Sequence, residues 1–562
     1  MARWQWKQWQ GILIASTGVT AMITLAITLG WLEFLECTAL DWFFRMRPKE
    51  SVDPYIVLVT IEEQDITFSK DWPISDRTLN RVLESIKDQE PRVIGLDLYR
   101  NLPVEPGSEE LLATFAHTPN LIGIEKFISN KVPPPLGLSY PDQVGISDIV
   151  LDKDGKVRRA LMSIKPEDGE LRLGFPVKIA LAYLAEEGIN PVSGNNPNQE
   201  VLIGKAKFSI LKAYRGGYGA IDDGGYQILL NYRGLEDTFT AISLTDVIQG
   251  NIPQGLFRDR IVIIGSIAES LNDALLTPYS IGERYPGMMI HANIISQIVN
   301  GAIHGRPMLK TVAKPLELSL IWLWAILGGS LQWWVLQKTT YKLNVFKQIQ
   351  DSLIVLMGPL GLQWALSYGS FISGVWLPII AANLSLVSSI LVIKSYHSRY
   401  LQNLVSKDEL TQVCNRRYFE QALSREWLRY HGNHETSAQI SLIFCDVDCF
   451  KLYNDSLGHQ AGDQCLIQVA QAIKESVRTS DIVARYGGEE FAVILPDTQL
   501  PLASQIAERI RQNVHNLGIV HKASTVSSNV TISCGIATIK IGLHSSPKEL
   551  LGKADLALYR AK

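Results

Sequence analysis

Carboxylate side chains cluster in two short stretches in the last quarter of the sequence. Asp446 and Asp448 follow an apolar run at 440–445 that predicts a strand. Glu489 and Glu490 follow a Gly-Gly pair between two runs rich in Val, Ile and aromatic residues, which predicts a β-hairpin. Oxygen ligands suit Mg²⁺, which usually keeps substrate phosphates in its shell. The two stretches together predict a magnesium-dependent site for a phosphate-bearing substrate.

The Gly-Gly pair is expected to shape the tip of the hairpin. Gly487 and Gly488 can adopt positive φ without strain and carry no side chain that would obstruct a ligand. Because side chains alternate along a strand, Glu489 and Glu490 are expected to point to opposite faces. An ordinary exposed turn is the alternative interpretation, since Gly dipeptides are common in turns.

Four motifs in order resemble the GGDEF family of diguanylate cyclases, over roughly residues 406–562. The signature reads Gly487-Gly488-Glu489-Glu490-Phe491, and an N-terminal motif at 408–419, the Asp446–Asp448 pair and the stretch 450–463 precede it. The resemblance implies condensation of two GTP into cyclic di-GMP with release of two pyrophosphates. It also implies a homodimer, because each domain binds one GTP. Helical and strand patterns in this region predict helices packed on a largely antiparallel sheet. The resemblance implies the same, since the family has such a fold, akin to the palm of nucleotidyl cyclases.

The resemblance also assigns roles to individual residues. Asp448 is expected to support the metal ligands, and Asp463 to accept hydrogen bonds from guanine, which adenine cannot donate. The expected ligands of Mg²⁺, or alternatively Mn²⁺, are Asp446, Glu489 and the Val447 carbonyl. The expected catalytic residues are Glu489 or Glu490 as general base and Lys451 as a phosphate contact. The expected substrate-binding residues are Asn454, His459, Asp463 and Lys562.

A second nucleotide site is implied upstream of the hairpin. Arg478-Thr-Ser-Asp481 matches the RxxD inhibitory-site pattern of the family, and Arg509 is expected to provide a second arm. Arginine pairs bidentately with phosphate, so cyclic di-GMP is expected to act as a feedback inhibitor. A surface salt bridge is the alternative interpretation of the RxxD pattern.

Two features depart from the family pattern. Gln412 replaces the Gly that usually follows Leu-Thr in the N-terminal motif. The sequence ends at Lys562, before the Gly-Arg-Asn to which family members usually continue. We therefore expect either a truncated chain or impaired activity. A receptor that binds GTP or cyclic di-GMP without catalysis and a membrane interaction scaffold remain as alternatives.

The composition of the 562 residues predicts a membrane protein of several domains. Apolar residues make up 46% and charged residues 19%, and the net charge of −3 offers no basic surface for nucleic acid. Apolar runs predict transmembrane helices at 11–32, 316–336, 353–368 and 371–393. Lys338, Lys342 and Lys347 between the second and third runs indicate a cytoplasmic loop. The expected topology in a bacterial inner membrane has a cytoplasmic N-terminus at 1–10, an outside domain at 33–315, a helical linker at 394–407 and a cytoplasmic domain at 408–562.

The outside region alternates strands and helices, which predicts an α/β domain with a mixed sheet. It resembles a CHASE domain of the second type, an extracytoplasmic sensor, through Leu40-Asp41-Trp-Phe-Phe-Arg45, Ile94-Gly95-Leu-Asp97, Val262-Ile-Ile-Gly265 and Tyr285–Asn293. The resemblance implies an unidentified extracytoplasmic ligand. Asp97 and His291 are candidate contacts, although structural roles are favoured for both. Five of the six cysteines lie in the C-terminal part, which suits a reducing cytosol, and Cys445 and Cys449 are interpreted as core residues rather than zinc ligands.

Overall fold

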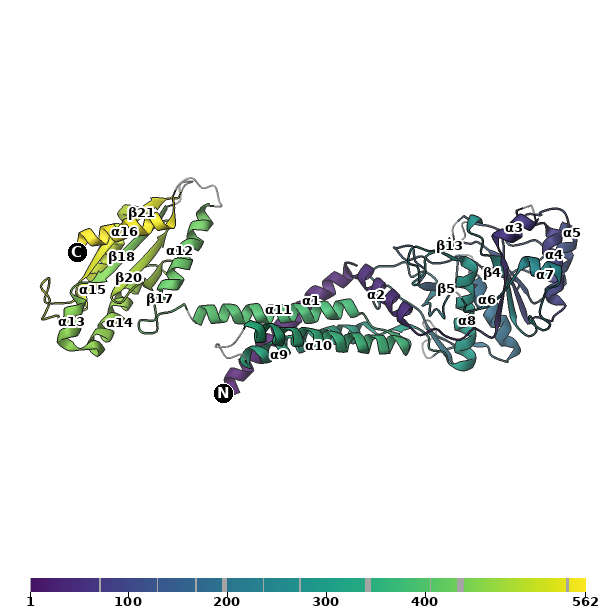
Figure 1. Cartoon of the computed structure of the whole chain (residues 1–562), viewed down its shortest axis with the longest axis horizontal. Coiled ribbons are helices and arrows are strands. Elements are labelled where there is room, and N and C mark those ends of the chain that lie inside the picture. Colours follow the sequence, from purple (N-terminus) through teal and green to yellow (C-terminus); the bar gives the residue numbers. More distant parts are fainter. Residues whose placement is uncertain are drawn as a thin grey trace. The chain divides into compact units, whose positions relative to one another are not determined.

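The computed structural model describes residues 2–69, 72–128, 130–166, 169–194, 200–235, 237–271, 274–338, 345–404, 406–431, 439–541 and 545–562. The chain forms two compact units, Met1–Lys394 and Ser395–Lys562 (Figure 1). The helices that begin in the first unit are α1 Ala2–Thr28, α2 Glu33–Met46, α3 Glu63–Ser69, α4 Asp76–Lys87, α5 Ser108–Ala116, α6 Phe175–Glu186, α7 Leu244–Gln249, α8 Gly287–His304, α9 Lys314–Lys338, α10 Val345–Ile372 and α11 Ile379–Leu404, with a 3₁₀ turn at Glu269–Leu271.

The main sheet of the first unit has the strand order β11-β1-β12-β2-β3-β4, and all of its pairs are parallel. Its strands are β1 Ile56–Ile61, β2 Val93–Asp97, β3 Leu121–Glu125, β4 Val144–Ile146, β11 Thr240–Ser243 and β12 Ile261–Ser266. The central strands are buried on both faces, as expected for a parallel sheet covered by helices. The α/β class is therefore confirmed, whereas the prediction of one mixed sheet was wrong.

The antiparallel strands of this unit gather in separate small sheets instead. These are β10-β5-β6, β7-β8-β9 and β13-β14, and β15 pairs in parallel with β16. Short irregular connections leave too little regular strand for these segments to extend the main sheet. Their bounds are β5 Arg159–Ile164, β6 Arg172–Leu173, β7 Pro191–Ser193, β8 Glu200–Ile203, β9 Ala206–Ser209, β10 Tyr226–Leu229, β13 Ala274–Leu275, β14 Tyr285–Pro286, β15 Lys310–Thr311 and β16 Val375–Trp376.

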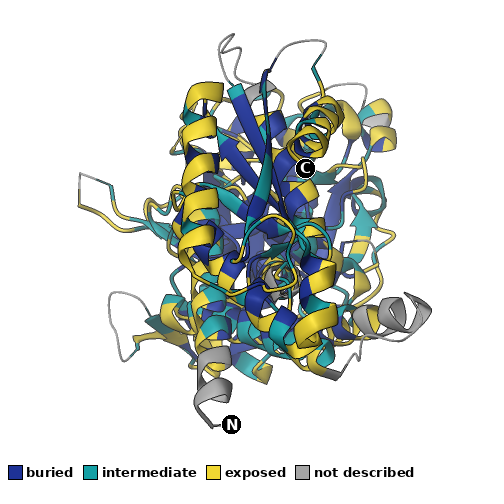
Figure 2. Ribbon diagram, turned by 90° about the vertical axis from the view of Figure 1, so that its left-hand side faces the viewer, coloured by how far each residue is buried: buried dark blue, intermediate teal, exposed yellow. Residues whose placement is uncertain are grey.

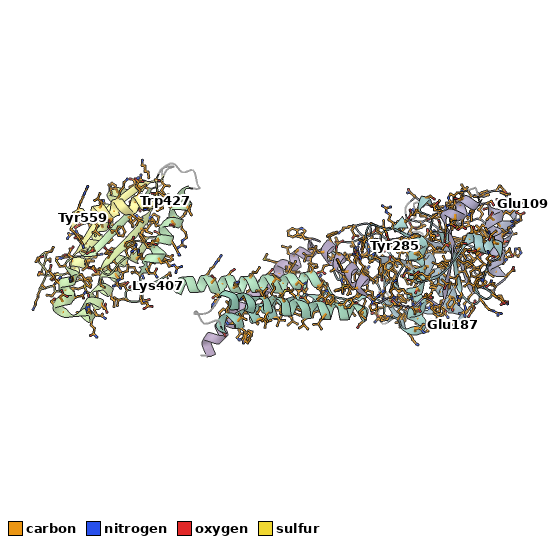
Figure 3. All side chains as sticks on the ribbon, in the orientation of Figure 1. Glu109, Glu187, Tyr285, Lys407, Trp427 and Tyr559 are labelled. Atoms are coloured by element: carbon orange, nitrogen blue, oxygen red, sulfur yellow. The ribbon has the colours of Figure 1, made fainter. Side chains whose placement is uncertain are left out.

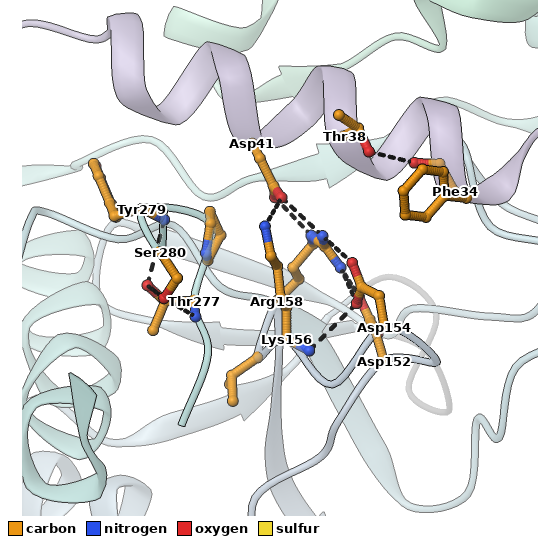
Figure 4. Close-up of polar contacts among 12 residues, drawn as sticks. Phe34, Thr38, Asp41, Asp152, Asp154, Lys156, Arg158, Thr277, Tyr279 and Ser280 are labelled. Atoms are coloured by element: carbon orange, nitrogen blue, oxygen red, sulfur yellow. Dashed lines mark hydrogen bonds and ion pairs between the residues drawn. The ribbon is translucent and has the colours of Figure 1, made fainter. Parts of the chain in front are cut away.

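A buried charge network fixes α2 to the small sheets (Figure 4). Arg158 is 1% exposed and donates to both carboxylate oxygens of Asp41, at 2.7 and 2.9 Å. Its remaining donors reach Asp152 and Asp154 at 2.7–2.9 Å, and Lys156 lies 2.6 Å from Asp41. Removing one partner of such a cluster leaves charges buried without compensation, which typically costs about 3–5 kcal/mol. The α2 helix, which the sequence patterns did not predict, is thus held rigidly to its unit.

Three helical segments among the described residues are long and apolar enough to cross a membrane: Trp9–Thr28, Lys314–Gln337 and Ile379–Arg399. The predicted segment 353–368 lies within α10, which contains Pro359 but is not one of those three. The predicted segment 371–393 starts too early as a helix. Gly374 has φ of +85° and Val375–Trp376 pairs with Lys310–Thr311, so α11 begins only at Ile379. Lys342 lies outside the described residues.

The second unit is a five-stranded sheet in the order β17-β19-β20-β18-β21, with helices packed against it. Only β17–β19 is parallel, so the predicted largely antiparallel sheet is confirmed. The strands are dark blue and the outer helix surfaces yellow in Figure 2. Of the two residues of this unit that Figure 3 labels on helices, Trp427 of α12 is buried and Tyr559 of α16 is 80% exposed. Its elements are α12 Arg416–His431, α13 Phe450–Leu457, α14 His459–Glu475, α15 Leu500–Asn516, α16 Pro547–Ala561, β17 Cys414–Asn415, β18 Gln439–Val447, β19 Ile482–Arg485, β20 Glu490–Pro496 and β21 Ile532–Lys540.

Candidate active site

The end of β18 and the tip of the β19–β20 hairpin meet in one place. Asp446 pairs in register with Glu490, and the Val447 amide lies 3.4 Å from the Glu489 carbonyl oxygen. Asp446 is buried, whereas Glu489 and Glu490 are half-buried. The antiparallel ladder between β18 and β20 therefore brings together the two carboxylate stretches that are far apart in sequence.

The hairpin turn differs from the sequence prediction in one respect. Neither Gly487 nor Gly488 is among the residues with positive φ, so that part of the prediction was wrong. A Cβ atom at Gly487 would lie 2.3 Å from Glu490 Oε2, so a larger residue there would displace the end of the Glu490 side chain. Gly488 has open space around it.

An ion pair that the sequence analysis missed fixes the hairpin tip. Arg485 Nη1 lies 3.1 Å from Asp408 Oδ1 of the N-terminal motif. The same guanidinium donates to the Gly488 carbonyl oxygen at 2.7 and 3.0 Å. Arg485 was visible in the sequence as the residue two positions before Gly487, but only the fold reveals its partners.

Lys562 lies beside the buried carboxylate of Asp446. Its ammonium nitrogen is 2.6 Å from Asp446 Oδ1, an oxygen that is otherwise buried without a hydrogen-bond donor. The contact is an ion pair rather than a well-aligned hydrogen bond. A divalent cation at Asp446 Oδ1 would have to displace this ammonium, because two cations at one oxygen repel each other.

Asp448 is held by the neighbouring strand region. Its two carboxylate oxygens accept hydrogen bonds from Ser533 Oγ at 2.6 Å and Thr531 Oγ1 at 2.7 Å. Its amide donates to the Thr531 carbonyl oxygen. Both oxygens are thus engaged within the protein, which fits a supporting role for Asp448 rather than direct coordination.

The predicted nucleotide contacts lie on α13 and α14, which follow β18 directly. Asn454 Oδ1 is buried without a hydrogen-bond partner, and a Cβ on Gly462 would sit 1.8 Å from it. Gly462 therefore leaves room for the Asn454 amide. Lys451, His459 and Asp463 are exposed.

The RxxD segment forms a tight turn before β19. The Arg478 amide donates to Asp481 Oδ2 at 2.9 Å, and the Asp481 amide donates back to the Arg478 carbonyl oxygen. Arg509 of α15 donates twice to the Ser476 carbonyl oxygen, at 2.9 and 2.7 Å. The structure brings the three predicted residues to one region, and the guanidinium of Arg478 is exposed there.

The candidate metal ligands fit a hard cation. Asp446 and Glu489 supply carboxylate oxygens and Val447 a carbonyl oxygen, which are the donor types that Mg²⁺ and Mn²⁺ take. Among the described residues no group of three or more His, Cys, Asp or Glu side chains could hold a metal ion. The expected set contains only two such side chains, so phosphate oxygens of the substrate would complete the shell.

A separate cavity of about 780 Å³ lies in the first unit, beside the carboxyl ends of β1 and β12. Ligands of parallel α/β sheets usually bind at this edge. Its lining includes Thr60, Ser266, Arg284 and Tyr285, the last of which is labelled in Figure 3. Asp97 is not part of it: this carboxylate is buried 3.9 Å from His291 Nε2, and burial raises the pKa of Asp97 to about 7.

Comparisons with known proteins agree with this geometry. Residues 18–330 match the CHASE2 domain, and residues 405–562 match the "Diguanylate cyclase, GGDEF domain". Diguanylate cyclase A of Treponema denticola is 36% identical over 176 residues, which are 31% of this chain and 46% of that protein. The response regulator PleD of Caulobacter vibrioides is 38% identical over 173 residues, 30% of this chain and 37% of that protein.

Among solved structures, the GGDEF domain of DgcB from Caulobacter crescentus in complex with c-di-GMP is 34% identical, covers 28% of this chain and 88% of that chain, and has a TM-score of 0.25. The chain spans less than half the length of the two curated relatives named above. The CHASE2 match alone extends over more than half of its residues. The chain therefore belongs to the CHASE2 domain family, and it carries a diguanylate cyclase GGDEF domain.

Proposed function

We propose that the chain is a membrane-bound sensory diguanylate cyclase that condenses two GTP into cyclic di-GMP and releases two pyrophosphates. The observation that carries this proposal is the register of β18 with β20, which sets Asp446 opposite Glu490 and the Val447 amide beside Glu489. The cavity beside β1 and β12 is the place where an extracytoplasmic ligand would act.

Each GTP supplies a 3′-hydroxyl that attacks the α-phosphate of the other GTP, and each attack expels one pyrophosphate. Glu489 or Glu490 takes the hydroxyl proton, since both stand at the hairpin tip. A bound Mg²⁺ would neutralise charge on the phosphate oxygens, held by Asp446, Glu489 and the Val447 carbonyl. Lys451 and Lys562 add cationic contacts to the phosphates. Because one domain holds one GTP, two domains must face each other in a homodimer.

Side chains of α13 and α14 would recognise the guanine base. The unpartnered Asn454 Oδ1 needs a donor, and guanine offers N–H groups on its Watson–Crick edge. The exposed carboxylate of Asp463 can accept from two guanine N–H groups at once. Adenine presents an acceptor at the same position, so it would leave these acceptors unpaired at high cost.

Access to cytoplasmic GTP requires four membrane crossings in this proposal. The helices α1, α9, α10 and α11 would each cross once, which places 33–315 outside and the GGDEF domain inside. With only the three most apolar helices crossing, both domains would lie on the same side. A reporter fused after Ser406 should therefore behave as cytoplasmic, and one fused after Gly216 as extracytoplasmic.

The decisive experiment uses the full chain in lipid nanodiscs with GTP and Mg²⁺. Mass spectrometry should identify cyclic di-GMP and pyrophosphate as products. A protein that binds GTP but forms no cyclic di-GMP would be a receptor instead, and one that binds neither nucleotide would be a scaffold.

A further inference from the structure

Two cysteines that the proposed chemistry does not use lie in contact across the central sheet of the second unit. Cys445 of β18 and Cys534 of β21 are direct cross-strand partners, and their sulfur atoms are 3.5 Å apart. Both belong to the same hydrophobic cluster, Cys445 fully buried and Cys534 at its margin. Among the six free thiols, this pair has the geometry from which a bond can form.

A disulfide fits between these strands without a change of register. Its Cα atoms usually lie about 4.4–6.8 Å apart, and directly opposed residues of antiparallel strands lie about 4.5–5.5 Å apart. The sulfur atoms need to approach from 3.5 Å to about 2.05 Å, which side-chain rotation and a small approach of the two strands supply together.

One of the two thiols is reachable from solvent. Cys534 lines a groove of about 530 Å³ between β21 and α15, together with Glu508 and Arg511. The sulfur is the nucleophile in thiol oxidation, so an oxidant must reach it through this groove. Cys445 has no such access, so Cys534 is the thiol that meets an oxidant first.

We propose that Cys534 and Cys445 form a reversible redox modification site that responds to hydroperoxides. The Cys534 thiolate attacks one oxygen of the peroxide, which gives a sulfenic acid at Cys534 and expels hydroxide or alkoxide. The Cys445 thiol then displaces the sulfenic oxygen as water, forms the sulfur–sulfur bond and loses its proton to that leaving group. A cytosolic dithiol reverses the step by thiol–disulfide exchange.

The cross-link would act directly on the candidate active site. Cys445 precedes Asp446, and Cys534 follows Ser533, which holds the Asp448 carboxylate. Pulling the two strands together at this level shifts both carboxylates, and catalytic positions tolerate shifts well below 1 Å. We therefore expect oxidation to lower turnover. This expectation rests on the proposed cyclase function, whereas formation of the disulfide does not.

The test treats the full chain in nanodiscs with hydrogen peroxide and maps peptides without reduction. We expect a peptide pair linked through Cys445 and Cys534 that disappears after dithiothreitol. Cys534→Ser should lack it, and Cys465→Ser, which removes a buried thiol of α14, should retain it. Linkage mainly through Cys449, or over-oxidation of Cys534 without any link, would overturn the proposal.

A second measurement separates this site from the cyclase assignment. Cyclic di-GMP formation by the wild type should fall at least tenfold on oxidation and return with dithiothreitol, while Cys534→Ser keeps its rate. A linked peptide with an unchanged rate would refute the regulatory effect alone. A linked peptide in a chain that never forms cyclic di-GMP would refute the proposed function and leave the modification site standing.

Discussion

Glu36 of α2 caps the start of α11, and its replacement by Gln should change how stability depends on pH. Both carboxylate oxygens accept backbone N–H groups at that helix terminus, from Ile379 at 2.9 Å and Ala381 at 2.8 Å. Glu36 is 1% exposed and lies outside the three apolar spans. Burial raises the pKa of Glu36 from 4.5 to about 7, against the lowering effect of these hydrogen bonds.

The sign and the size of the expected change in stability with pH follow from proton linkage. Because the folded state binds this proton more tightly than the unfolded state, the contribution of Glu36 to stability is greatest below pH 4.5. It is lost as the pH rises to about 7 and is constant above that. The pKa difference corresponds to about 3 kcal/mol over this interval. Gln carries no charge and accepts with one oxygen only, so Glu36→Gln is less stable than the protonated wild type by about 1 kcal/mol, and its stability has no such slope with pH.

The neighbouring residue provides the assay. Cys37 is buried, so its alkylation reports local opening of α2, and peptide mass spectrometry isolates it from the other thiols. Alkylation rates divided by those in denaturant give the opening free energy at each pH. From pH 5 to pH 8, wild-type protection should fall about a hundredfold relative to Glu36→Gln.

Two controls test whether the pH dependence comes from Glu36. The pKa of Asp97 is also raised to about 7 by burial, but both proteins carry Asp97, so its contribution cancels. Glu33→Gln is the matched control on the same helix, because Glu33 pairs with Lys153 rather than capping α11. Parallel pH curves for the wild type and Glu36→Gln would refute the role assigned to the cap.

Three predictions concern the second unit. Glu489→Gln should lower the rate of cyclic di-GMP formation by at least a hundredfold while GTP binding persists, and a wild-type rate would remove Glu489 from the mechanism. Asp463→Asn should relax the preference for GTP over ATP, measured as the ratio of kcat/KM values, because an amide offers one acceptor where the carboxylate offers two; an unchanged ratio would show that Asp463 does not read guanine. Arg478→Ala should raise the cyclic di-GMP concentration needed for inhibition and spare the initial rate, since the exposed guanidinium has no role at the hairpin; superimposed inhibition curves would leave the RxxD segment as a turn only.

Sequence patterns located the elements whose hydrophobic period is strong. Helix α4 and strand β12 belong to the predicted alternation of strands and helices, because α4 has an apolar face and β12 an apolar run that can only be buried one way. The order of the GGDEF motifs predicted the fold of the second unit. The motif Leu40–Arg45 was recognised but its helix α2 was not, because the buried face of that helix includes Glu33, Glu36 and Asp41 and shows no apolar period.

In the candidate site, sequence patterns identified the residues but could not predict which of them contact each other. Asp446 and Glu490 were recognisable as carboxylates, but only the register of β18 with β20 sets them opposite each other. Asp408 and Arg485 are separated by 77 residues, so their ion pair has no local signal. The Gly487 prediction failed because the turn does not use positive φ there, and the nearest neighbour of that position is the end of the Glu490 side chain.

The contacts of α2 connect the segment before β5 to the start of α11 within the first unit. Arg158 of the small sheet holds Asp41, and one and a half turns away Glu36 holds the first amides of α11. Both contacts are buried and charge-assisted, so a shift of the sheet against α11 must break one of them or move α2 as a rigid body. Breaking the Arg158–Asp41 pair leaves buried charges unpaired, at a cost of several kcal/mol. A ligand that binds one arrangement of the sheet more tightly than another would therefore displace the start of α11, the helix that leads toward the GGDEF domain. The free energy available for this displacement is at most the difference between the ligand's binding free energies for the two arrangements.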